Sequence, residues 1–162
     1  MAPEHKAIAA FPLKIRDFRS SDAVRISEIL RDSTEAALWP PESYAKLAAS
    51  PGGVFLVCEA HAQLIGFLAA RQVADEAEIL NVAVHPDFRR KGVASALLLA
   101  ALDKFRRSAI ARLFLELRES NLPARALYER HGFISFGRRK SYYRDPAEDA
   151  LCMQKKIIGT SD

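Results

Sequence analysis

A long amphipathic helix that starts immediately after a strand constrains the possible folds of this chain more than any other feature. Its apolar residues recur at i, i+3, i+4, i+7, i+8 and i+11, at Ala94, Leu97, Leu98, Ala101, Leu102 and Phe105. Residues 78–85 before it have the composition of a strand, and Pro86 and Asp87 then form a turn. A strand, a tight turn and a helix in immediate succession predict a mixed α/β or α+β domain.

The rest of the sequence divides into further strands and helices. Strands are predicted at residues 13–17, 54–60, 64–73, 112–118, 133–136 and 150–158, and helices at 23–31, 42–49 and 121–131. Strands 54–60 and 64–73 should form a hairpin, whereas the basic, tyrosine-containing segment 137–149 should connect the last two strands as a loop. The predicted order of elements is β-α-α-β-β-β-α-β-α-β-β.

Length and composition fit one globular domain. The chain has 162 residues, of which 49% are hydrophobic and 27% charged, and no apolar run approaches the roughly 20 residues of a membrane-spanning helix. We expect residues 1–12 to form a flexible N-terminus and residues 13–158 to form the domain. Only two cysteines, far apart, and the lack of an apolar secretory signal predict a cytoplasmic protein without membrane contact.

The turn before the long helix contains the pattern Arg-x-x-Gly-x-Ala at residues 89–94. A helix start offers unpaired N–H groups, and Gly92 can adopt a positive φ and let a ligand approach the backbone. With the basic residues beside it and a net charge of +4, this segment suits a phosphate or pyrophosphate group. A solvated basic turn is the alternative interpretation. Neither a P-loop nor a Gly-x-Gly-x-x-Gly motif is present, which argues against those nucleotide sites.

Residues 78–95 resemble the coenzyme A-binding motif of the GNAT family of acetyltransferases. The similarity continues through Leu-Phe-Leu-Glu-Leu-Arg-Glu-Ser-Asn at 113–121, Ala-Leu-Tyr-Glu-Arg-His-Gly-Phe at 126–133, and the segments 137–143 and 148–153. Over residues 76–155 this combination is similar to the RimI-type ribosomal-protein-alanine N-acetyltransferases, a subgroup of that family. The resemblance implies a single mixed, mostly antiparallel sheet of about seven strands flanked by about four helices.

The resemblance also implies acetyl-CoA as the cosubstrate and assigns residues to it. In the family, the strand matching 78–85 parts from the next strand, so main-chain contacts to the pantetheine arm would fall at Val82, Ala83 and Val84. The pyrophosphate would lie over the turn and helix start, at Arg89, Arg90, Lys91, Gly92, Val93, Ala94 and Ser95. Asn121 would contact the cofactor too, although Asn in this place is also a good N-cap residue.

Two residues are candidates for proton transfer. Glu116 interrupts an otherwise apolar strand, and the resemblance makes it the base that takes a proton from the acceptor amine, directly or through water. An exposed polar strand position is the alternative, and Glu78 and Glu76 are further candidate bases. Tyr128 would give a proton to the departing thiolate, whose conjugate acid has a pKa of about 8.5 against about 10 for the phenol. A buried structural tyrosine is the alternative for Tyr128.

The acceptor site is the part of the sequence that departs most from the family. RimI-type proteins carry a Phe-Pro-Trp-Ser-like segment after the first helix, whereas this chain has Ala-Leu-Trp-Pro-Pro-Glu-Ser at residues 37–43. Trp39, Tyr142 and Tyr143 are the candidate acceptor-binding residues, but the tyrosines could instead anchor their loop to the sheet. No metal is predicted, because the four histidines lack metal-ligand spacing. Cys58 and Cys152 are predicted to be inert, buried thiols.

The resemblance implies an enzyme that transfers acetyl within a ternary complex to the α-amine of an N-terminal alanine on a ribosomal protein. Acetylation of a small-molecule amine or of a broader set of protein N-termini is the alternative. A CoA-sensing module without activity is a second alternative. No aromatic–basic RNA motif is present, so direct nucleic-acid binding is not expected. We expect a monomer or a weak dimer.

Overall fold

The computed structural model describes residues 11–157 and confirms the predicted order of strands and helices. Short 3-10 turns at Ser20–Asp22 (η1) and Pro86–Phe88 (η2) precede α1 and α3. The strands are β1 (Lys14–Asp17), β2 (Gly53–Ala60), β3 (Gln63–Val73), β4 (Glu76–Val84), β5 (Arg112–Arg118), β6 (Ile134–Tyr143) and β7 (Glu148–Lys156). The helices are α1 (Ala23–Arg31), α2 (Pro41–Ala49), α3 (Val93–Arg107) and α4 (Leu122–Arg130).

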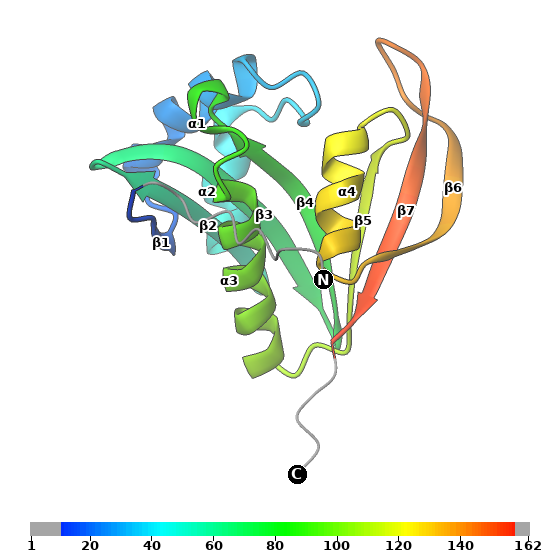
Figure 1. The fold of residues 1–162 in the computed structure, drawn as a ribbon. Helices are drawn as coiled ribbons and strands as arrows, with labels where there is room; N and C mark the ends of the chain where they lie inside the picture. Colours follow the sequence, from blue (N-terminus) through cyan, green and yellow to red (C-terminus); the bar gives the residue numbers. More distant parts are fainter. Residues whose placement is uncertain (1–10, 158–162) are drawn as a thin grey trace, which may run out of the picture.

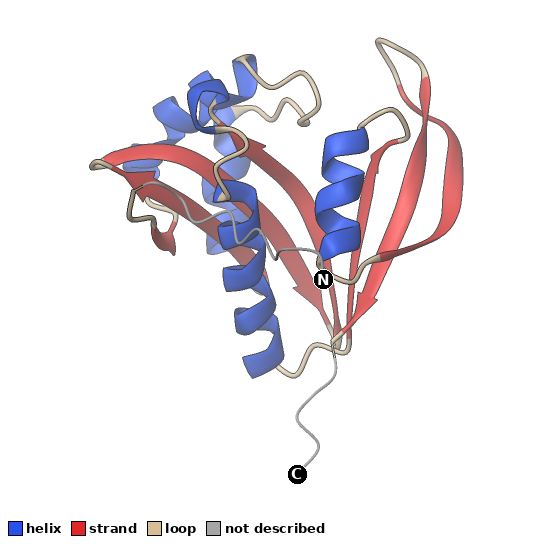
Figure 2. Cartoon of the chain, in the orientation of Figure 1, coloured by secondary structure: helices blue, strands red, loops and turns tan. Residues whose placement is uncertain are grey.

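All seven strands form one sheet in the order β1-β2-β3-β4-β5-β7-β6 (Figure 1). Every neighbouring pair is antiparallel except β4 and β5, which are parallel and connected by α3. Helices cover both faces of the sheet (Figure 2). The expected fold, a mixed and mostly antiparallel sheet with four helices, is therefore confirmed.

The predicted loop at 137–149 is wrong in extent. β6 continues through this segment to Tyr143 and pairs with β7, so only residues 144–147 form the turn between them. β6 is the edge strand of the sheet, and nearly all of its residues are exposed on both faces. An edge strand without a buried face needs no alternation of apolar and polar residues, which is why its basic sequence reads as a loop.

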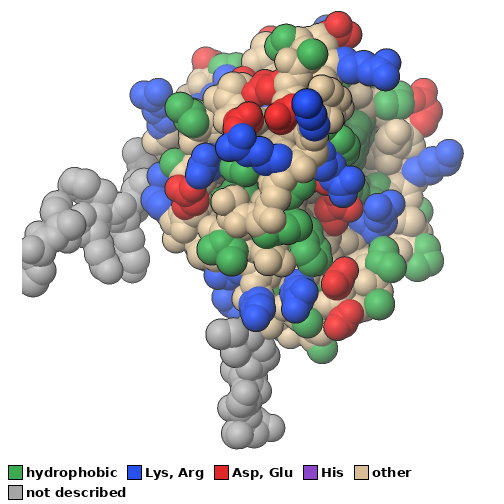
Figure 3. All heavy atoms as spheres, turned by 90° about the vertical axis from the view of Figure 1, so that its right-hand side faces the viewer, with side chains coloured by type: hydrophobic (Ala, Val, Ile, Leu, Met, Phe, Trp, Pro, Cys, Tyr) green, Lys and Arg blue, Asp and Glu red, His purple; other side chains and the backbone are tan. Residues whose placement is uncertain are grey.

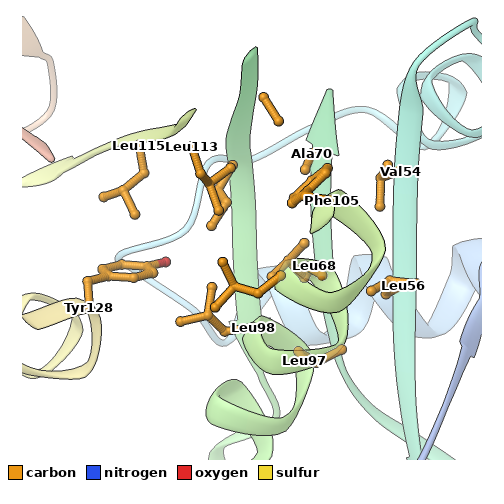
Figure 4. Packing of buried hydrophobic residues seen from close by; sticks show 14 of the residues in the cluster. Val54, Leu56, Leu68, Ala70, Leu97, Leu98, Phe105, Leu113, Leu115 and Tyr128 are labelled. Carbon is orange, nitrogen blue, oxygen red and sulfur yellow. The ribbon is translucent and has the colours of Figure 1, made fainter. Parts of the chain in front are cut away.

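Two apolar clusters hold the helices on the sheet. The larger one joins α3 and α4 to one face, and it includes Leu68, Leu97, Phe105, Leu113 and Leu115 (Figure 4). The smaller one joins α1 and α2 to the other face of β2, β3 and β4 through residues such as Ile26, Ile29, Tyr44, Phe55 and Phe67. The second face of β5, β7 and β6 receives no helix among the described elements.

A β-bulge in β4 changes which face its side chains occupy. Ala69 pairs with Asn81 and Ala70 with Ile79, so Leu80 is the extra residue. Before the bulge, Ile79 belongs to the cluster under α3, whereas after it Ala83 belongs to the cluster under α1 and α2. The bulge therefore turns β4 at the place where the strand leaves β5.

The turn between α2 and β2 allows a specific stability prediction. A Cβ atom at Gly53 would lie 1.8 Å from the Leu47 carbonyl oxygen, so the backbone must move to accommodate one. We expect Gly53→Ala to lower the free energy of unfolding by about 1–3 kcal/mol. Gly137→Ala in β6 is the matched control, because a Cβ there would meet no atom within 4 Å. Equal denaturation midpoints for the two variants would contradict this packing.

Only the last two residues of the predicted flexible N-terminus, residues 1–12, belong to the described part of the chain. Residues 1–10 of the segment 1–12 lie outside the described residues, as does the end of the predicted strand 150–158. Phe11 is described, and its ring contacts Phe88 edge-on at 5.7 Å between centroids. Among residues 11–157, no helix has the length and hydropathy needed to cross a membrane.

Candidate active site

A gap between β4 and β5 is the central feature of the site. The two strands pair only from Glu76–Ile79 and Arg112–Leu115, yet β4 continues to Val84 and β5 to Arg118. Within the described chain, the edge of β4 at Val82, Ala83 and Val84 that faces the gap therefore has no strand partner, although its other edge pairs with β3. The Val84 carbonyl on this edge accepts a hydrogen bond from Arg89 Nε, and main-chain groups of an open strand that lack a partner can bind an extended ligand that carries amide groups.

The start of α3 lies at the end of this open edge. Gly92 is the N-cap residue with φ 80°, as predicted, and no side chain caps the first-turn amides of Val93, Ala94 and Ser95 among the described residues. Arg90 also has a positive φ, of 60°, which is unusual outside glycine and asparagine. Uncapped amides at a helix N-terminus attract anions, so this turn fits a pyrophosphate.

The three basic residues of the turn have different surroundings. Arg89 donates hydrogen bonds to the Asp32 carbonyl at 2.9 Å and to Ser33 Oγ at 3.2 Å, and its Nε donates to the Val84 carbonyl. The Lys91 ammonium lies over the Phe88 ring at 5.7 Å from its centroid. Arg90 is exposed. The Arg89 guanidinium is therefore bound to protein acceptors, whereas the Arg90 side chain is not buried.

α4 borders the gap on the β5 side. Asn121 is the N-cap residue of α4, and its Oδ1 accepts a hydrogen bond from the Ala124 amide at 3.2 Å, as predicted. At the other end of the helix, His131 Nε2 lies 3.0 Å from Ser95 Oγ in the first turn of α3. Burial is the main cause that lowers the pKa of His131, which favours the neutral ring. Sequence patterns gave no sign of this contact between α3 and α4.

Glu116 lies in the middle of β5 at the level where the gap begins. Its neighbours Leu115 and Leu117 belong to the core under α3 and α4, so the Glu116 side chain points to the opposite face of the sheet. The side chain is 16% exposed and forms an ion pair with Arg139 of β6. Glu116 therefore has a carboxylate that is largely buried and still open to a ligand.

A cleft of about 570 Å³ borders Glu116 on this face. Its lining includes Glu76 and Glu78, the two other candidate bases, as well as Arg71 and Arg139. Viewed from the side of β6 and β7, basic and acidic side chains are interspersed on the surface (Figure 3). Three carboxylates therefore line the same cleft. Glu116 is the one that lies where the gap between β4 and β5 begins.

Tyr128 lies on the opposite face of the sheet from Glu116, on the face that α3 and α4 cover. It projects from α4 into the larger core, is 7% exposed, and packs edge-on against Phe133 at 5.4 Å. Figure 4 shows its ring beside Leu115 and its hydroxyl directed towards β4. Burial raises the pKa of Tyr128 above its ordinary value, so the hydroxyl stays protonated at neutral pH.

The two adjacent tyrosines of β6 are in different environments. Tyr143 is half-buried, the Arg118 guanidinium lies 4.6 Å from its ring centroid, and burial raises the pKa of Tyr143 to about 12. Tyr142 is 52% exposed, and a hydrogen bond to the Glu116 carboxylate is the main cause that raises its pKa. This arrangement favours an anchoring role for Tyr143 and leaves Tyr142 open to a ligand beside Glu116.

The remaining candidates lie outside this cluster. Trp39 is half-buried against the α1–α2 cluster, and its carbonyl accepts a hydrogen bond from the Tyr44 hydroxyl at 3.0 Å. Cys58 and Cys152 are buried free thiols, and burial raises the pKa of Cys58 to about 11. Across residues 11–157, no three His, Cys, Asp or Glu side chains are grouped so that they could hold a metal ion.

An open strand edge that leads to an uncapped helix start defines a class of enzyme that holds an extended, diphosphate-bearing cofactor against its sheet. Residues 23–133 match the model of the acetyltransferase (GNAT) family. The chain belongs to this family of acetyl-CoA-dependent N-acetyltransferases.

Named relatives and solved structures agree with the family. A Bacillus subtilis protein, provisionally named a ribosomal protein bS18-alanine N-acetyltransferase, is 35% identical over 86% of this chain and 92% of its own length. The Escherichia coli enzyme of that name is 40% identical over 59% of this chain and 66% of its own. The crystal structure of the Escherichia coli ribosomal-protein-S18-alanine N-acetyltransferase superposes with a TM-score of 0.82 at 29% identity, and the match covers 93% of this chain and 97% of that one.

Proposed function

We propose that this protein transfers an acetyl group from acetyl-CoA to the α-amine of an N-terminal alanine on a ribosomal protein, within a ternary complex. The observation that supports the chemistry is the placement of Glu116 and Tyr128 beside the gap between β4 and β5, on opposite faces of the sheet. The choice of acceptor is supported by the names of relatives that match most of the chain. A ribosomal acceptor would place the reaction in the cytoplasm.

The open edge of β4 and the start of α3 fit the two ends of the cofactor. Main-chain groups of Val82, Ala83 and Val84 would hold the amide-bearing arm, and the amides from Gly92 to Ser95 would hold the pyrophosphate. Arg90 and Lys91 would add positive charge near it, and Asn121 would border the arm from the start of α4. The cofactor supplies the acetyl group as a reactive thioester.

Glu116 would accept the proton that the acceptor amine loses. An N-terminal α-amine has a pKa of about 7.7–8.0, whereas that of lysine is about 10.4, so less free energy is needed to deprotonate the α-amine near neutral pH. Holding this amine and the thioester side by side lowers the entropic barrier to their reaction. Trp39, Tyr142 and Tyr143 would orient the acceptor chain, with Tyr142 next to the base.

Tyr128 would donate a proton to the departing sulfur, and this role gives a prediction. We expect Tyr128→Phe to lower kcat by about 10²-fold, the lower end of the range for general acids, because a thiolate leaves without full protonation. The ring keeps its packing against Phe133, so the unfolding midpoint and the Kd for CoA should stay unchanged. Steady-state kinetics with CoA titration checks this, and undiminished kcat would leave Tyr128 as a structural residue.

A peptide-library experiment tests the proposed acceptor. The protein is incubated with acetyl-CoA and peptides that differ in their first residue, together with free small amines, and products are identified by mass spectrometry. We expect one acetyl group on the α-amine of peptides that begin with alanine. Acetylation of small amines alone would replace the proposal with its small-molecule alternative.

A further inference from the structure

A buried asparagine of β4 holds the connection between α1 and α2. Asn81 is 5% exposed, and it follows the bulge, where its side chain turns towards the α1–α2 face. Its Nδ2 donates to the Ala37 carbonyl at 2.8 Å, and its Oδ1 accepts from the Ala37 amide at 3.3 Å. The Asn81 side chain therefore hydrogen-bonds both the main-chain amide and the main-chain carbonyl of Ala37, which lies in the irregular segment between α1 and α2.

An arginine of β5 holds the turn between β6 and β7 in the same manner. Arg118 donates to the Pro146 carbonyl at 2.9 Å and to the Arg144 carbonyl at 3.1 Å, and its side chain is only 15% exposed. Its guanidinium stacks on Tyr143 and pairs with Glu148 at 3.4 Å. A planar guanidinium can bind two carbonyls at fixed positions, which an ammonium group cannot do equally well.

Asn81 and Arg118 lie on the two neighbouring strands that separate at the gap, β4 and β5. Asn81 belongs to β4 and Arg118 to β5, and each holds a segment on its own side of the gap. Figure 1 shows that the α1–α2 connection and the β6–β7 turn both lie at the end of the sheet where β4 and β5 are farthest apart. Trp39 follows Ala37 by two residues, and Tyr143 directly precedes Arg144.

We propose that Asn81 and Arg118 are positioning residues for the acceptor entrance. The α1–α2 connection, residues 32–40, and the β6–β7 turn with the end of β6 before it, residues 141–147, form its two walls, and these two side chains fix the walls relative to β4 and β5. Neither residue needs to touch the acceptor. The inference rests on the proposed function for the identity of the acceptor. Neither side chain belongs to the two apolar clusters, so a change at either position should loosen one wall without unfolding the domain.

The test combines kinetics with hydrogen exchange on the full chain. We compare Arg118→Lys, Asn81→Leu and, as a matched control, Arg112→Lys at the exposed start of β5. Each positioning variant should raise the KM for an Ala-initiated peptide about tenfold, the effect of one lost charge-assisted or buried hydrogen bond. The Kd for CoA should remain within about twofold of the wild-type value in all three variants.

Hydrogen exchange reports on each wall separately. Arg118→Lys should speed exchange at residues 141–147 only, Asn81→Leu should speed it at residues 32–40 only, and Arg112→Lys should change neither. Asn81→Asp is the second variant at its position; its carboxylate keeps an acceptor for the Ala37 amide but repels the Ala37 carbonyl in a buried site, so exchange at residues 32–40 should again be faster than in the wild type.

Two results would overturn the inference. One is unchanged exchange in both walls, and the other is faster exchange with an unchanged acceptor KM. A wild-type protein that acetylates no Ala-initiated peptide would contradict the proposed function instead. In that case the exchange measurements, which need no acceptor, still decide whether Asn81 and Arg118 hold the two segments.

Discussion

Replacement of Glu116 by glutamine is expected to lower kcat by about 10²–10⁴-fold, the usual contribution of a general base. Glutamine has nearly the same shape but cannot accept a proton at neutral pH. Glu116 lies on the face opposite α3 and α4, away from the amides that fit the cofactor, so the Kd for CoA should stay close to its wild-type value. Initial rates of acetyl transfer to an Ala-initiated peptide measure the effect.

Glu78→Gln and Glu76→Gln are the controls for this variant, because both carboxylates line the same cleft. We expect each control to retain most of the wild-type kcat. If Glu116→Gln remained fully active while Glu78→Gln lost activity, the base would be Glu78, and the ion pair of Glu116 with Arg139 would be structural.

Replacement of Gly92 by valine is expected to weaken CoA binding about 10–100-fold. Gly92 has φ 80°, and a residue with a Cβ atom costs roughly 1–2 kcal/mol in this conformation, more when it is β-branched. The added side chain would also crowd the amides at the start of α3, where the pyrophosphate is proposed to bind. Isothermal titration calorimetry with CoA measures the change in Kd directly.

Gly52→Ala separates backbone strain from an effect on the site. Gly52 has a similar φ of 77°, but it lies in the turn before β2, and a Cβ atom there would meet Gln72 of β3 rather than the start of α3. This control should lower the unfolding midpoint and leave the Kd for CoA unchanged. A Gly92→Val protein that binds CoA as tightly as the wild type would show that the turn at residues 89–95 does not hold the cofactor.

The features that could be predicted from the sequence are those that depend on interactions between residues close together in the chain. The proline turn at Pro86, the helical periodicity of α3, and the positive φ of Gly92 each depend on residues close in sequence. The Asn121 cap is a further example, because the bond to Ala124 spans three residues. These signals are sufficient to predict the order of elements and the start of α3.

The features that escaped prediction depend on partners far apart in sequence. The pattern at residues 89–94 suggests a free Arg89 side chain, but Arg89 donates hydrogen bonds to acceptors at the end of α1. The ion pair of Arg139 with Glu116 across β7 likewise joins residues far apart in sequence. The strand β6 was predicted at residues 133–136, but its continuation to Tyr143 was missed because an edge strand carries no buried face. Asn81 and Arg118 gave no signal in the sequence, since their roles depend on where the gap between β4 and β5 opens.

Determination of a crystal structure with CoA at saturating concentration tests the central claim most directly. The account predicts that the amide-bearing arm lies along Val82–Val84 in the gap between β4 and β5, with the pyrophosphate against the amides from Gly92 to Ser95. A cofactor bound elsewhere on the molecule, or an empty gap at saturation, would contradict the account.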